Sequence, residues 1–182
     1  MLEGKKITIR SFEDFDLMTL FQWSVQTKWN SFFLDDKNDV EIKSFIQLKK
    51  DYKEKRSQAL IPPLPFVIGE TDANTIGFMR FTIPSGNNLN ALMSIAFVQE
   101  EHLSTELGKE AGSLILDYLF NRRNLFRVYT KVIEEERDHL DYLMNLGFKL
   151  EGTQRQQIFL QGRYLNLCTL GILKEEVDLS TL

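Results

Sequence analysis

The chain has 182 residues, 43% hydrophobic and 12% aromatic, enough to bury a sizeable core in one domain over residues 1–182. Twenty-six acidic against 22 basic residues give a net charge of −4, which argues against nucleic acid or an anionic membrane as the main partner. A single cysteine, Cys168, and two histidines exclude an intramolecular disulfide and a Cys/His metal cluster, so we expect no metal.

The start of the chain, residues 1–6, lacks the apolar stretch of a signal peptide. The apolar runs along the whole sequence are also far shorter than a membrane span. Together with the lone cysteine, these features lead us to expect a protein of the reducing cytoplasm that does not bind a membrane.

The first half of the chain begins with a strand and two helices. Residues 6–10 alternate polar and apolar side chains, as a half-buried strand does. Ser11 then opens a predicted helix with one broad apolar face, made of Phe15, Leu17, Met18, Leu20, Phe21 and Trp23. A second helix is predicted over 39–55, ending near Pro62, with an apolar stripe of Val40, Ile42, Phe45, Ile46 and Leu48 opposite lysines 49, 50, 53 and 55.

The strands that follow are predicted from alternation and turn residues. Residues 65–69 and 76–83 read as two strands of a hairpin about 71–75, and residues 85–88 turn the chain into a strand over 91–98. A helix over 103–123 and a strand over 127–133 complete a strand, helix, strand unit, which predicts parallel pairing.

The end of the chain adds one helix and one hairpin. Residues 134–145 predict a short helix that turns Leu140, Leu143 and Met144 inward and is stopped by Gly147. Strands over 148–160 and 164–173 form a terminal hairpin about 161–163. We therefore predict a mixed α/β fold (α+β by some schemes): a single mixed, mostly antiparallel sheet of about seven strands, with about four helices on both faces.

Four short motifs carry a family resemblance. Leu146-Gly-Phe-Lys-Leu-Glu-Gly152 is similar to Leu-Gly-Phe-x-x-Glu-Gly, and Gly108-Lys-Glu-Ala111 is similar to Gly-Thr-Glu-Ala. Gly162-Arg-Tyr-Leu-Asn166 is similar to Gly-x-Tyr-x-Asp, and Arg10 followed by Asp14-Phe-Asp16 is similar to the opening of one subgroup. With the order of elements, these motifs resemble the GNAT superfamily of acyl-CoA N-acyltransferases, in its RimJ/RimL-like or spermidine-acetyltransferase-like subgroup.

The resemblance implies acetyl-CoA as cosubstrate. The pantetheine arm would pair with the backbone of Phe97, Val98 and Gln99, and the pyrophosphate would rest on amides that open the next helix, in the segment Leu103, Ser104, Thr105, Glu106, Leu107, Gly108 and Lys109. Of the family's Gln/Arg-x-x-Gly-x-Gly/Ala pattern only Gly108 is in place, and Glu106 adds a negative charge beside the pyrophosphate or is an ordinary acid of a first helical turn. Glu136 and His139 occupy the family's Asn-x-x-Ser positions and are the remaining candidate cofactor contacts.

The catalytic and substrate candidates also follow from the resemblance. Ser94 occupies the place of a glutamate base, and Tyr142 adjoins Leu143, the place of the tyrosine that protonates the departing thiolate. Glu100 is a further candidate base, or a solvated loop carboxylate; Tyr142 is otherwise a packing or surface residue, and His139 a base or an exposed helix residue. An amine-binding wall is predicted from aromatic and acidic residues, with core packing as the alternative for the aromatics: Trp29, Phe33, Asp35 and Asp36.

Two functions fit this sequence. The first is an N-acetyltransferase that moves an acetyl group from acetyl-CoA to a primary amine of a protein N-terminus, a polyamine or another small molecule, acting as a monomer or homodimer. The second is a catalytically impaired protein of the same fold that recognises a small ligand or a partner chain. The segment from Leu103 to Gly108 discriminates between them, because sites rather than folds carry chemistry.

Overall fold

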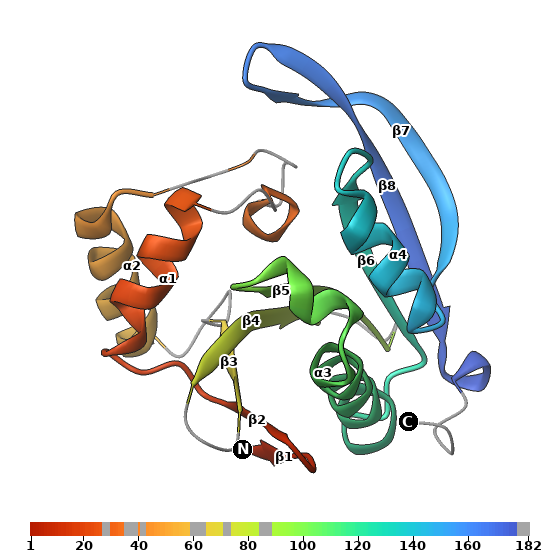
Figure 1. Cartoon of the computed structure of the whole chain (residues 1–182), viewed down its shortest axis with the longest axis horizontal. Helices are drawn as coiled ribbons and strands as arrows, with labels where there is room; N and C mark the ends of the chain where they lie inside the picture. Colours follow the sequence, from red (N-terminus) through yellow and green to blue (C-terminus); the bar gives the residue numbers. More distant parts are fainter. Residues whose placement is uncertain are drawn as a thin grey trace.

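The computed structural model describes residues 1–26, 30–34, 40, 43–58, 65–70, 74–83 and 89–177. Within these residues the chain forms one eight-stranded sheet in the order β1-β2-β3-β4-β5-β6-β8-β7 (Figure 1). The strands are β1 (Leu2–Glu3), β2 (Ile7–Arg10), β3 (Phe66–Glu70), β4 (Thr75–Thr82), β5 (Asn90–Phe97), β6 (Arg127–Ile133), β7 (Lys149–Leu160) and β8 (Arg163–Leu173).

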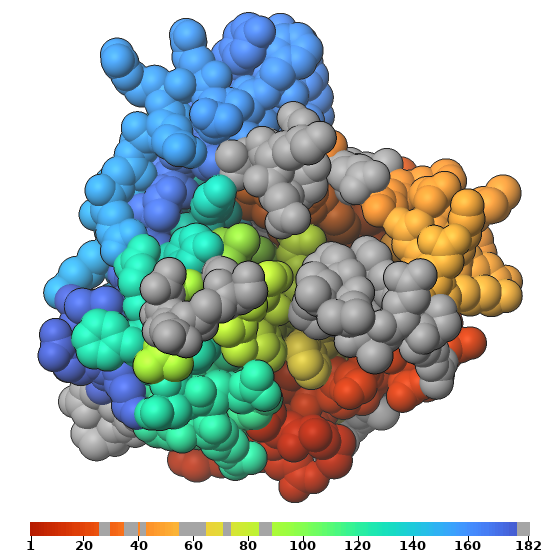
Figure 2. Space-filling model, turned by 180° about the vertical axis from the view of Figure 1, so that it is seen from behind, coloured from red at the N-terminus to blue at the C-terminus, as the bar shows by residue number. Residues whose placement is uncertain are grey.

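Only β5 and β6 pair in parallel; every other neighbouring pair is antiparallel. This confirms the predicted mixed, mostly antiparallel sheet. The additional strand is β1, whose two residues are too few to show any periodicity in a sequence. The β7–β8 hairpin stands out beyond the rest of the sheet, at the top of Figures 1 and 2.

The helices cover both faces of the sheet, as predicted (Figure 1). The α-helices are α1 (Asp16–Gln26), α2 (Phe45–Gln58), α3 (Glu106–Asp117) and α4 (Arg137–Asn145). Phe78 of β4 contacts Phe12 and Trp23 on the α1 side, with ring centroids 6.3 and 5.5 Å away. Phe81, three residues along the same strand and therefore on the opposite face, contacts Tyr118 just beyond α3.

Several helix predictions were wrong in detail. The α1 stripe is narrower than predicted, because the helix begins after Phe15, whose side chain is 71% exposed, and Met18 also faces solvent. Helix α2 begins at Phe45, which leaves Ile46 exposed rather than in the core. Helix α4 begins at Arg137, and Met144 is exposed although the sequence predicts it inward.

The helix predicted over 103–123 consists of several pieces. A 3₁₀-helix, η2 (Glu100–Ser104), precedes α3, and a π-helical turn, η3 (Tyr118–Arg122), follows it. Another 3₁₀-helix, η1 (Asn30–Phe33), lies between α1 and α2 in the chain. The predictions for Ile42, for Pro62 and for the turn at 85–88 lie outside the described residues, as does most of the turn at 71–75.

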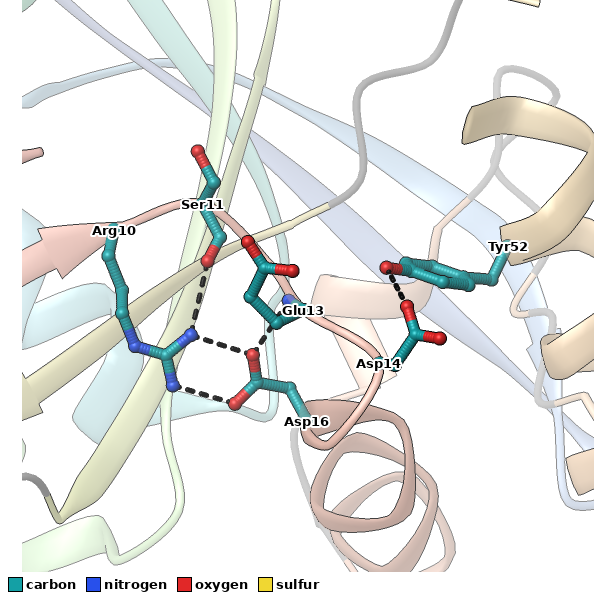
Figure 3. Close-up of polar contacts among 6 residues, drawn as sticks. All are labelled: Arg10, Ser11, Glu13, Asp14, Asp16 and Tyr52. Carbon is teal, nitrogen blue, oxygen red and sulfur yellow. Dashed lines mark hydrogen bonds and ion pairs between the residues drawn. The ribbon is translucent and has the colours of Figure 1, made fainter. Parts of the chain in front are cut away.

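A partly buried ion pair joins the end of β2 to the start of α1 (Figure 3). The two terminal guanidinium nitrogens of Arg10 donate to the carboxylate of Asp16 at 2.7 Å, and the Glu13 N–H donates to the same carboxylate at 2.8 Å. The hydrogen bonds to Asp16 raise the pKa of the Arg10 guanidinium above its usual value. The Tyr52 hydroxyl of α2 donates to Asp14 at 2.6 Å, so a polar contact ties α2 to the segment between β2 and α1.

Candidate functional site

The site begins where β5 and β6 separate. These strands pair at only three positions, with Asn90, Ala91 and Leu92 opposite residues 127, 128 and 129. From residue 93 onward β5 is paired with β4 alone, and residues 130–133 of β6 are paired with β8 alone. The two strands therefore form a V whose wide end lies beyond their carboxyl ends, Phe97 and Ile133 (Figure 1).

The open edge of β5 exposes backbone groups inside this V. The Val98 N–H donates to the Ile76 carbonyl at 2.8 Å. The backbone N–H and C=O groups of the even-numbered residues in β5 therefore point toward β4. The backbone groups of Met93, Ile95 and Phe97 consequently face β6. Of the three predicted backbone contacts, Phe97 lies on the open edge. The Val98 N–H is already engaged, and the Gln99 carbonyl accepts from the His102 N–H at 3.2 Å.

The start of α3 lies directly against η2. Thr105 caps the helix, with its hydroxyl 3.5 Å from the Gly108 N–H, and Ser104 donates its hydroxyl to the Glu101 carbonyl at 3.0 Å. A Cβ added at Gly108 would lie 2.0 Å from the His102 carbonyl oxygen, which accounts for glycine at this position. Glu106 and Lys109 are exposed, whereas Leu103 and Leu107 are half-buried and packed against the core.

Tyr142 joins α4 to the start of α3. Its hydroxyl donates to the Gly108 carbonyl at 2.9 Å, and its ring meets Phe97 edge-on at 5.6 Å between centroids. Burial raises the pKa of the Tyr142 hydroxyl far above its usual value, so the group stays protonated. The structure therefore places this candidate acid between two helices rather than in the cavity described below.

Because the Tyr142 hydroxyl is buried, we expect the folded state to lose stability at alkaline pH. Because a tyrosine in the unfolded chain ionises at pH ~10 and Tyr142 in the folded chain does not, the free energy of unfolding should fall above that pH, by about 1.4 kcal/mol per pH unit from this proton. Tyr142→Phe should remove this part of the slope, as measured by urea unfolding from pH 8 to 11. Tyr164→Phe, which changes an exposed tyrosine, is the control and should keep it. Equal slopes in the two variants would contradict the assignment.

A cavity of about 540 Å³ lies at the wide end of the V. Glu100, which follows β5, and Ile133, the last residue of β6, both line it. The other described lining residues come from α1, η1, the start of α4 and the β7–β8 hairpin: Ser24, Val25, Asn30, Glu135, Glu136, Arg137, Asp138, His139, Leu160, Gln161, Arg163 and Leu165. Four carboxylates against two guanidinium groups make this lining acidic, and Arg163 is engaged by Glu135 at 2.7 and 2.9 Å.

Glu136 and His139 form a buried pair in the wall of this cavity. Glu136 Oε2 lies 3.4 Å from His139 Nδ1, and their side chains are only 7% and 3% exposed. Glu136 Oε1 accepts from the Ser31 N–H at 3.0 Å, and Ser31 Oγ in turn accepts from the Ile133 N–H at 2.7 Å. The alternative that His139 lies on an exposed helix face was therefore wrong.

The remaining candidates are not gathered in the cavity. Ser94 is half-buried opposite Arg80 of β4, on the sheet face that carries η1, and does not line the cavity. Phe33 packs against Trp23 and Phe32 with ring centroids 5.4 and 5.3 Å away, which favours the packing interpretation. Trp29, Asp35 and Asp36 lie outside the described residues.

Sequence reasoning missed Glu135 and Asp138, which line the cavity, and Ser31, whose N–H holds the Glu136 carboxylate. One signal was available: acidic residues cluster directly after the β6 strand, at the carboxyl edge where ligands of parallel strands gather. Ser31 had no signal, because its role depends on a contact with a carboxylate 105 residues away.

Comparisons with known proteins agree with this geometry. The family model described as "Acetyltransferase (GNAT) domain" matches residues 9–167. Spermidine N(1)-acetyltransferase of Escherichia coli K12 is 28% identical over 79 residues, which are 43% of this chain and only 42% of that relative. A spermidine N-acetyltransferase from Vibrio cholerae, solved with CoA and spermine, superposes with TM-score 0.77 at 21% identity, covering 95% of this chain and 98% of the other.

A dodecameric structure of spermidine N-acetyltransferase from V. cholerae gives TM-score 0.74 at 22% identity, with 94% and 96% of the two chains covered. Among the described residues there is no group of three or more His, Cys, Asp or Glu side chains able to hold a metal ion. None of the helices in the described part of the chain has the length and apolarity to cross a bilayer. The match over residues 9–167 shows that this chain belongs to the GNAT acetyltransferase family.

Proposed function

We propose that the protein transfers an acetyl group from acetyl-CoA to a primary amine that carries at least one further positive charge, such as a polyamine. The observation that carries this proposal is the acidic cavity at the wide end of the V between β5 and β6. An amine seated there lies next to the open strand edge along which a thioester donor would bind. The relatives named above, which act on spermidine or were solved with spermine, agree with this acceptor class.

The residues present fit acetyl-CoA through their backbone. Ile95 and Phe97 direct peptide groups into the V beyond the last β5–β6 pair, and the first amides of α3 lack acceptors within the helix and attract an anion. The close approach at Gly108 keeps that end of α3 compact against η2. Acetyl-CoA supplies the acetyl group as an activated thioester, and its pyrophosphate would rest beside Thr105 and Glu106.

Charge selects the acceptor in this proposal. Glu100 and Asp138 are exposed at the cavity wall and attract a second cationic centre, while the first amine reaches the V. One exposed ion pair contributes only roughly 0.2–1 kcal/mol of interaction free energy. Two of them acting on one polyamine are therefore worth about a factor of ten in apparent affinity.

Thiol release with acetyl-CoA and spermidine tests the proposal. Wild type should release CoA, and it should use spermidine better than a monoamine of similar length. The double variant Glu100→Gln with Asp138→Asn should raise the spermidine KM roughly tenfold, following the charge estimate above. Glu175→Gln, which removes an exposed acid outside the cavity, should leave KM unchanged.

Calorimetric titration with acetyl-CoA distinguishes the two functions that the sequence leaves open. Heat at or below about 1 mM ligand, roughly −4 kcal/mol, supports the enzyme. Spermidine binding without acetyl-CoA binding or thiol release would instead favour a binding protein. Light scattering in the same samples tests the predicted monomer or homodimer against a larger assembly such as the dodecamer seen for the V. cholerae protein.

A further inference from the structure

The last N–H on the open edge of β6 is bound by a side chain from a distant element. The Glu134 N–H donates to the Asn166 carbonyl of β8 at 3.0 Å, so the Ile133 N–H points the opposite way, into the V. Strand β5 no longer pairs with β6 at this position, and Ser31 Oγ of η1 accepts from the Ile133 N–H at 2.7 Å instead. Because a buried N–H without an acceptor is costly, Ser31 satisfies a group that the separation of the strands leaves open.

A second hydrogen bond from the same residue restricts the orientation of η1. The Ser31 N–H donates to Glu136 Oε1 at 3.0 Å, and this carboxylate is only 7% exposed. Ser31 therefore binds the end of β6 through its hydroxyl and the residue before α4 through its backbone. Two bonds in different directions hold η1 both in place and in rotation.

The other end of η1 is held by β4. Arg80 donates to the Leu34 carbonyl at 2.6 Å, and its guanidinium lies 5.4 Å from the centroid of the Phe32 ring. Strand β5 lies between β4 and β6 in the sheet, and η1 contacts β5 as well as β6. The short helix η1 therefore crosses β5, with one anchor on each neighbouring strand.

Ser31 is separate from the cavity that it supports. It is 2% exposed and is not among the residues that line the cavity, whereas Asn30 before it and both of its partners, Ile133 and Glu136, do line it. A ligand in the cavity consequently meets Asn30 and not Ser31. A substitution at Ser31 reaches such a ligand through the position of η1 and of the residues that Ser31 holds.

We propose that Ser31 is a positioning residue for the acceptor amine: by holding η1 to the end of β6, it fixes the wall of the cavity to which Asn30 belongs. This inference rests on the proposed function, since it assigns the cavity to the acceptor. The wall must keep its place relative to the β5 edge, because small displacements of a positioned reactant lower the rate of transfer steeply.

Kinetics of Ser31→Ala test the proposal. The spermidine KM should rise about tenfold with kcat within about threefold of wild type, because the acceptor wall moves while the donor edge on β5 stays in place. The acetyl-CoA Kd from calorimetry should stay within about twofold of wild type. A purely structural role would lower only the fraction of folded enzyme, and with it the apparent kcat, and would leave the spermidine KM unchanged.

Ser113→Ala is the matched control. Ser113 of α3 is also buried, and its Oγ has no hydrogen-bond partner among the described residues. The variant thus removes a buried hydroxyl without breaking a bond, and its spermidine KM should match that of wild type. A rise in KM equal to that of Ser31→Ala would overturn the proposal. Circular dichroism and thermal unfolding show whether each variant is folded.

Hydrogen exchange measured by NMR tests the contact without acetyl-CoA. In Ser31→Ala the Ile133 amide should exchange at least about tenfold faster than in wild type, because local opening then breaks no bond to η1. The Glu134 amide, which is bound to β8, is the internal reference and should be unchanged. In wild type, saturating spermidine should slow exchange at Ile133 more than at Glu134, because an amine in the cavity holds η1 against β6.

The outcomes separate this inference from the proposed function. Thiol release by wild type together with an unchanged spermidine KM in Ser31→Ala would overturn the role of Ser31 and leave the acetyltransferase intact. If Ser31→Ala does not fold, the wild-type exchange decides, and equal effects of spermidine at Ile133 and Glu134 would overturn the role. A wild type without thiol release would overturn the acetyltransferase; calorimetry with spermidine would then decide the role of Ser31, with equal Kd values in wild type and Ser31→Ala against it.

Discussion

Replacing Gly108 with alanine is expected to lower the free energy of unfolding by about 3 kcal/mol, at the upper end for an overpacked site. The added Cβ would lie 2.0 Å from the His102 carbonyl oxygen, a backbone atom of η2, so either η2 or the start of α3 must shift. The same shift should weaken acetyl-CoA binding, because the first amides of α3 would move relative to the β5 edge. Urea unfolding and calorimetry measure the two effects.

Gly152→Ala is the matched control. Gly152 lies in β7, and no atom lies within 4 Å of a Cβ added there, so the change in stability should stay within about 0.5 kcal/mol. If Gly108→Ala matched this control in both stability and acetyl-CoA affinity, the tight contact between η2 and α3 would have no energetic role.

Replacing Asp16 with alanine is expected to lower the free energy of unfolding by about 2–3 kcal/mol. Breaking a buried ion pair typically costs about 3–5 kcal/mol, and the value is reduced here because the Arg10 side chain is 29% exposed and regains water. The variant also loses the acceptor for the Glu13 N–H at the start of α1. Urea unfolding at pH 7 measures the loss.

Lys149→Ala provides the comparison with an exposed ion pair. Lys149 Nζ lies 2.6 Å from Glu176 Oε1, but its side chain is 69% exposed, so its removal should cost less than about 1 kcal/mol. Equal losses in the two variants would mean that burial of Asp16 adds nothing to the pair. Because α1 carries Ser24 and Val25 into the cavity wall, Asp16→Ala should also raise the KM for the amine.

The local pattern of the sequence determined most of the sheet. Alternation, glycine and the terminal turn at 161–163 are properties of neighbouring residues, and they placed the strands other than β1, and the parallel β5–β6 unit, correctly. The motif from Leu146 to Gly152 is also local. Its seven residues lead from the end of α4 into β7, and they could therefore indicate the family from the sequence. The buried faces of the helices were less predictable, as Phe15 and Ile46 show. The residue at which a helix begins, and its orientation there, decide which side chains reach the core.

Only the tertiary structure decided the composition of the site. Glu100, Glu136 and His139 are separated by up to 39 residues in the sequence, and they meet because β5 and β6 stop pairing after Leu92 and leave a cavity between their ends. The sequence by itself determined that a glutamate and a histidine lie three residues apart at the start of one helix. Their burial depends on Ser31 from a distant 3₁₀-helix, and such long-range contacts leave no periodic trace in the chain.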